Sequence, residues 1–236
     1  ENAMDGNGSS RGRLKMKIVL ILCLLSLSFI NILAQERFVT PVDEADKNAS
    51  FLAFRTKLIQ AVQKRDVKFV LSIVDKNIKN GFGGDDGIAN FKKQWKIYNR
   101  NSEFWKEFST VLTHGGTFDK ENKLSFYAPY LFTVFPEDID AFEYQAIFGN
   151  NVNLRAKPDV NSSIVAVLSY NVVQTDWENS VKSKSNQNEF LWVKIKTLGG
   201  KIGYVKPEFV RSSIDYRAGF DKIRGRWIMT FFVAGD

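Results

Sequence analysis

The sequence predicts an α+β fold with a helical N-terminal region, a small β-barrel and a closing C-terminal β-hairpin. Apolar residues recur at helical spacing before residue 114, and short apolar runs separated by turn residues follow residue 142. An alternating apolar strand then ends the chain. With 236 residues, 44% of them hydrophobic and 25% charged, the chain can bury a sizeable core. This composition excludes a disordered chain and a multi-pass membrane protein.

The first 34 residues have the features of a secretory signal peptide. Lys15 and Lys17 precede an apolar run that ends at Ala34, a small residue at the expected cleavage position. The run is shorter than the roughly 20 residues that span a bilayer comfortably, so a retained membrane anchor is the less favoured alternative. We therefore expect an exported protein, periplasmic or extracellular, that meets the membrane only through an uncleaved leader.

Charge and cysteine content limit the chemistry. The net charge is +7, but lysines and arginines are dispersed, with small clusters at 92–96 and 222–226. A nucleic-acid-binding protein usually gathers them on one face, so we expect no nucleic-acid partner. The only cysteine, Cys23, lies in the leader, which leaves the rest of the chain without a thiol nucleophile, disulfide or thiolate metal site.

Changes in composition predict five segments. They are the leader (1–34), a polar linker (35–48), a helical α+β region (49–142), the barrel (143–212) and a C-terminal strand pair that packs on the N-terminal region (213–236).

Apolar spacing predicts four helices in the helical α+β region, between residues 49 and 116. The first carries Phe51, Phe54, Leu58 and Val62 on one face. The others are expected to run from an N-cap at Asp66 to Val74, from Asp85 or Asp86 to Trp95, and from Ser102 to the glycines at 115 and 116.

Six short strands are expected in the barrel, at 143–148, 152–155, 164–168, 172–176, 190–195 and 202–205. A Gly-Gly turn at 198–201 joins the last two. The closing pair is expected at 215–220 and 225–235, and both faces of its last strand are apolar.

Three short motifs mark the barrel segment: GNNVNLRAKP at 149–158, LWVKI at 191–195 and GKIGYV at 200–205. Together they resemble the bacterial SH3-type domain, with its x-V-N-x-R-x-x-P opening, its W-x-K-V strand and its G-x-x-G-W-V hairpin. Tyr204 replaces the commoner Trp, and Ser169-Tyr170-Asn171 replaces a glycine step. The resemblance implies an accessory module of an envelope protein, without catalytic residues, that binds a cell-wall component or a protein.

The segments on either side of the barrel are similar to a second fold. The helix pair at 61–74 and the closing GRWIM strand at 225–229 resemble the cone-shaped α+β fold of the nuclear-transport-factor type. This resemblance implies that the barrel is inserted between the helices and the last strands.

Aromatic residues of the barrel are the candidate binding residues. Trp192, Tyr204, Phe209 and Tyr170 can line a groove for a short peptide or glycan. The alternative is that some or all of them form the barrel core.

Two other functions stay open. The carboxylates of Glu137, Asp138, Asp140 and Glu143 could cleave a glycan if one had a raised pKa, although acids after a proline also suit a helix N-terminus. A conical pocket between Phe91, Trp95 and Phe231 could hold a small molecule.

We expect no metal site and no cofactor. His114 is the only histidine, and a single histidine cannot build a zinc site. The favoured hypothesis is a non-enzymatic binding module of the bacterial envelope.

Overall fold

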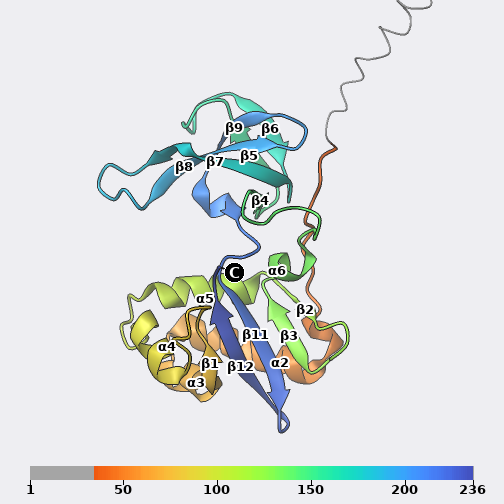
Figure 1. Ribbon diagram of the computed structural model, residues 1–236, viewed down its shortest axis with the longest axis vertical. Coiled ribbons are helices and arrows are strands. Elements are labelled where there is room, and N and C mark those ends of the chain that lie inside the picture. The colour runs from red at the N-terminus through yellow and green to blue at the C-terminus, as the bar shows by residue number, and fades with distance from the viewer. Residues whose placement is uncertain (1–34, 236) are drawn as a thin grey trace, which may run out of the picture. The chain divides into compact units, whose positions relative to one another are not determined.

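A computed structural model describes residues 35–235 (Figure 1). The predicted leader lies outside this range. The α+β class is confirmed, with helices in the N-terminal region, a small barrel and a C-terminal hairpin. Among the described residues, no helix is long and apolar enough to cross a membrane.

Most of the helices lie before residue 114. They are the 3-10 helix η2 (Ala45–Lys47), α2 (Ala49–Lys64), α3 (Val67–Ser72), α4 (Ile88–Trp95) and α5 (Glu103–Thr113), and the short α6 (Tyr130–Val134) follows later.

The caps explain where the helices begin. Asp66 accepts a hydrogen bond from the backbone N–H of Phe69, as the sequence predicts, and Ser102 accepts one from Phe104 at the predicted start of α5. The predicted Asp cap of α4 is wrong, because the N-cap is Gly87. Val74 also leaves its predicted helix, since α3 ends at Ser72 and Val74 begins a strand.

A five-stranded sheet forms the second layer of the α+β region, with the order β1-β12-β11-β3-β2. Its strands are β1 (Val74–Lys79), β2 (Thr117–Phe118), β3 (Ser125–Ala128), β11 (Arg217–Ile223) and β12 (Arg226–Val233). Strands β3 and β11 pair antiparallel although the whole barrel separates them in the sequence. The barrel is therefore inserted between two neighbouring strands of one sheet.

A bulge in β12 decides which of its aromatic rings enter the core. Gly219 lies opposite Phe231, but Phe220 lies opposite Met229, so Thr230 is an extra residue on β12. Phe232 consequently joins the core, with its ring centroid 5.1 Å from that of Trp95. The predicted pocket between Phe91, Trp95 and Phe231 is wrong, because the first two are buried core residues and Phe231 faces the other side of the sheet.

The barrel is a seven-stranded sheet with the order β10-β4-β7-β8-β9-β5-β6. Its strands are β4 (Tyr144–Ile147), β5 (Val152–Arg155), β6 (Ile164–Leu168), β7 (Val172–Lys182), β8 (Phe190–Thr197), β9 (Ile202–Val205) and β10 (Val210–Arg211), with the 3-10 helix η3 (Pro207–Phe209) before the last. Strand β7 continues beyond its predicted end at residue 176, so β7 and β8 form a long hairpin.

Residues 35–48 are packed rather than a free linker. Val39 is buried and donates a backbone hydrogen bond to Tyr170 of the barrel. Further along, the N–H of Gly116 in the α+β region donates to Val42. The segment therefore holds both regions through backbone hydrogen bonds, which a polar composition alone does not reveal.

Candidate functional site

Two of the four predicted binding residues share one pocket on the barrel. Trp192 of β8 and Phe209 of η3 line a pocket of about 220 Å³. Its other lining residues are Asn150, Asn151, Val152, Asn153, Arg155, Val160 and Lys206. We call this set the Trp192 pocket.

Strand register positions the base of the Trp192 pocket. Val193 lies opposite Val205, so Trp192 on β8 is the neighbour of Lys206 just after β9. The Lys206 ammonium is 4.3 Å from the centroid of the indole ring, within the range of a cation–π contact. Since Trp192 is only 7% exposed, the indole is mainly the floor of the pocket, while Phe209, at 36%, forms an accessible wall.

The two cations of the Trp192 pocket have no carboxylate partner among residues 35–235. Lys206 donates to the backbone oxygen of Leu191 at 3.4 Å, and Arg155 donates to that of Ser162 at 2.8 Å. Neither forms an ion pair with a described acid. The pocket therefore offers two positive charges and side-chain amides, which suits a ligand that carries a carboxylate.

The other two predicted residues lie elsewhere. Tyr204 is paired with Lys194 and Arg155 across neighbouring strands, so it stands beside the Trp192 pocket without lining it. Tyr170 lines a separate pocket of about 370 Å³ with His114 and Phe148.

His114 is the C-cap of α5. Its ring lies against Phe148, with 4.2 Å between ring centroids, and its Nδ1 is 2.7 Å from the carbonyl oxygen of Thr110. Because a carbonyl can only accept, Nδ1 carries the proton. Within the described part of the chain, no group of three or more His, Cys, Asp or Glu residues could hold a metal ion.

The acidic segment after Pro136 is a turn in which Asp138 has a cationic partner. Arg37 donates two hydrogen bonds to Asp138, and this guanidinium holds the pKa of the carboxyl below its usual range. A general acid of a glycosidase needs a raised pKa, so the shift at Asp138 has the opposite sign.

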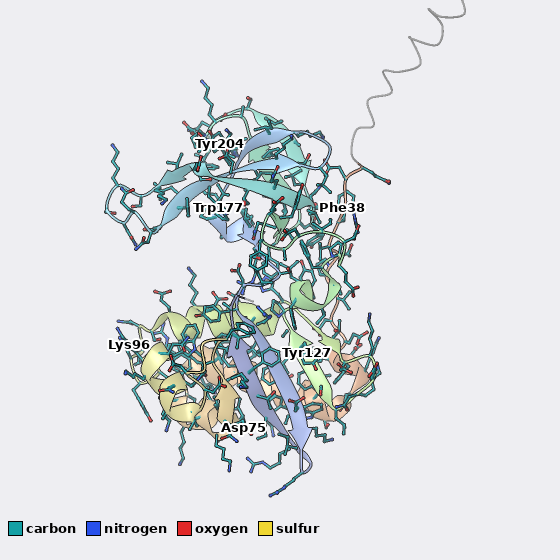
Figure 2. All side chains as sticks on the ribbon, viewed as in Figure 1. Phe38, Asp75, Lys96, Tyr127, Trp177 and Tyr204 are labelled. Atoms are coloured by element: carbon teal, nitrogen blue, oxygen red, sulfur yellow. The ribbon has the colours of Figure 1, made fainter. Side chains whose placement is uncertain are left out.

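Sequence reasoning missed Trp177. This residue of β7 is 43% exposed and lines a pocket of about 490 Å³ on the same barrel (Figure 2). A tryptophan followed at once by the polar run 178–180 interrupts the strand pattern, and that interruption was the available signal.

Comparison with known proteins agrees with the geometry of the barrel. No curated protein matches the chain significantly. Residues 150–211, which include every residue of the Trp192 pocket, match the bacterial SH3 domain family, so the chain contains a bacterial SH3 domain.

Proposed function

We propose that the protein is a non-enzymatic accessory module of the bacterial cell envelope, exported and active outside the cytoplasm. Its bacterial SH3 domain supports an accessory role, because such domains commonly bind cell-wall components. The proposed ligand is a cell-wall peptide that presents a carboxylate to the Trp192 pocket.

The absence of ion-pair partners for Arg155 and Lys206, among the residues described, carries this proposal. A carboxylate that enters the pocket gains charge-assisted hydrogen bonds without first displacing a protein acid. Phe209 supplies an apolar wall, and Asn151 and Asn153 present amides that can bond to a peptide backbone. A short peptide ending in a carboxylate satisfies all three features.

The hydrolase alternative has less support. It requires one of the carboxylates at 137–143 to remain protonated near neutral pH, whereas Arg37 favours the charged form of Asp138. We therefore propose a binding role in preference to hydrolysis.

The test is co-sedimentation of the chain from Gln35 onward with purified cell-wall sacculi at low salt. That part forms one compact unit. We expect Lys206→Glu to reduce the pelleted fraction at least tenfold, because it replaces an attraction by a repulsion.

Lys201→Glu is the matched control, since it makes the same charge change at an exposed turn outside the pocket. It should alter pelleting less than twofold. An equal loss of pelleting in both variants would show that the net charge of the protein, and not the pocket, causes the binding. If the unmodified chain does not pellet, a wall peptide is rejected as the ligand.

A further inference from the structure

Strand β7 contains a large bulge that exposes a tryptophan. Asp176 is paired with Lys194 of β8, and the next pair joins Val181 to Trp192. Residues 177–180 therefore stand opposite Val193 alone. A bulge of this kind interrupts the ladder of hydrogen bonds and re-aims side chains, and bulges are frequent beside functional sites.

The bulge is held in one conformation by its own polar groups. The Asp176 carboxylate accepts hydrogen bonds from the backbone N–H and the side chain of Asn179. The Ser180 hydroxyl donates to the backbone oxygen of Asp176 at 2.7 Å and accepts from the N–H of Lys194 at 2.9 Å. These hydrogen bonds replace those lost from the strand ladder, and they keep the backbone of Trp177 in place.

The Trp177 indole is only partly covered by residues 35–235. The indole packs on Phe190 with its ring tilted, at 5.1 Å between centroids, while 43% of the residue stays exposed. Its ring nitrogen makes no hydrogen bond within those residues. A rigid, half-exposed indole gives a large contact area at a small cost in conformational entropy.

The charged side chains of the pocket beside Trp177 balance one another. Its ionisable lining residues are two acids, Asp176 and Glu178, and two lysines, Lys194 and Lys196. Lys194 and Asp176 already pair at 3.1 Å. This balance contrasts with the positive Trp192 pocket and favours a neutral ligand with many hydrogen-bonding groups.

We propose that the Trp177 pocket binds a neutral saccharide unit. The face of a pyranose ring presents C–H bonds with partial positive charge, which meet the negative face of an indole. The hydroxyl groups at its rim can pair with carboxylates, ammonium groups and the Gln174 amide. At about 490 Å³ the pocket lies in the ordinary size range of small-ligand sites, roughly 300–1,000 Å³.

The saccharide site is independent of the peptide site. It shares no lining residue with the Trp192 pocket, so either proposal can fail alone. A protein with both would contact the glycan and the peptide of one wall polymer, and the two contacts would reinforce each other through effective concentration.

The test is a titration of the ¹⁵N-labelled chain from Gln35 onward with N,N′,N″-triacetylchitotriose, followed by NMR. The Trp177 indole signal, assigned by its loss in Trp177→Phe, should shift with a Kd of about 1 mM. Trp177→Ala should weaken binding at least tenfold, Trp177→Phe less, and Tyr98→Ala, a distant exposed aromatic, not at all.

Three results would overturn the proposal. One is an unshifted Trp177 indole at saturating sugar, and another is unchanged affinity in Trp177→Ala. The third is tighter binding of a galacturonic acid oligomer, because an anionic preference contradicts the balanced charge of the pocket. Lys206→Glu should leave the titration unchanged, which separates this test from that of the peptide site.

Discussion

The core of the α+β region is built largely of aromatic rings, whereas the core of the barrel is aliphatic. The large buried cluster of the α+β region contains Phe51, Phe91, Trp95, Phe104, Trp105, Phe108, Phe118, Phe126, Phe220, Trp227 and Phe232. The buried cluster of the barrel contains only Ile147, Val152, Leu154, Leu168, Val173, Val193, Ile195 and Val205.

Layer geometry explains this difference. Helices that pack on a sheet leave a broad interior in which aromatic rings meet edge to face, as Phe91 and Phe104 do at 5.5 Å. A small barrel of short strands has a narrow interior that branched aliphatic side chains fill. Aromatic residues on the barrel exterior, such as Trp177 and Phe209, therefore contribute little to its core, and we propose a role in ligand binding for both.

The largest expected effect comes from Phe51→Ala in the α+β region. Phe51 is fully buried, and its ring centroid is 4.1 Å from that of Phe126 and 4.8 Å from that of Trp227. Removal of the ring should lower the free energy of unfolding by about 3–5 kcal/mol. Urea denaturation of the chain from Gln35 onward measures this loss.

Trp177→Ala is the counterpart in the barrel. Because the indole is half exposed, the change should cost less than about 1 kcal/mol. A cost equal to that of Phe51→Ala would show that Trp177 is a structural residue and would remove the contrast between the two regions.

Local sequence signals predicted the features that depend only on neighbouring residues. Examples are the cap at Asp66, the start of α5 at Ser102 and the turn at 198–201. Gly87 replaces Asp86 as a cap because Lys79 and the N–H of Asn80 already use that carboxylate.

Two bulges account for the aromatic residue that sequence reasoning misplaced, Phe231, and for the one that it missed, Trp177. The extra residue Thr230 turns Phe231 away from the core, and the bulge at 177–180 exposes Trp177. Strict alternation predicts neither, since a bulge is fixed by pairing with a strand that lies elsewhere in the sequence. In the Trp192 pocket, sequence reasoning named the aromatic residues Trp192 and Phe209, but Arg155 and Lys206 join them only through strand register.

A medium effect is expected where the narrow barrel leaves no space for even one methyl group. A Cβ at Gly203 would lie 2.5 Å from the backbone oxygen of Arg155, on the adjacent strand β5. Gly203→Ala should therefore destabilise the protein by about 1–3 kcal/mol, measured by thermal or urea unfolding.

Gly81→Ala in the α+β region is the matched control. A Cβ at Gly81 meets no atom within 4 Å, and the loss of backbone freedom in the unfolded chain should make this variant neutral or slightly more stable. If the two alanine variants lose equal stability, close strand packing is not what requires glycine in the barrel.

The smallest expected effect on stability is electrostatic, and the pKa of the carboxyl involved is lowered in both regions. In the α+β region, Lys47 donates to the Glu44 carboxylate and the backbone N–H of Phe118 donates to its other oxygen. These bonds lower the pKa of Glu44, as Asn179 and Lys194 lower that of Asp176 in the barrel. An acid with a lowered pKa stabilises the fold above its unfolded pKa, about 4.3 for Glu, and loses that contribution as pH falls through the folded pKa.

Glu44→Gln should therefore reduce stability by about 0.5 kcal/mol near neutral pH, because the pair is partly solvated. The difference from the unmodified chain should shrink as the pH falls through the folded pKa of Glu44 and vanish at a pH well below it, where both side chains are neutral. Urea unfolding at the two pH values measures it. If the loss of stability persists in acid, Glu44 stabilises the fold through shape and packing rather than through its charge. The carboxylates of the two regions would then stabilise the protein by different means.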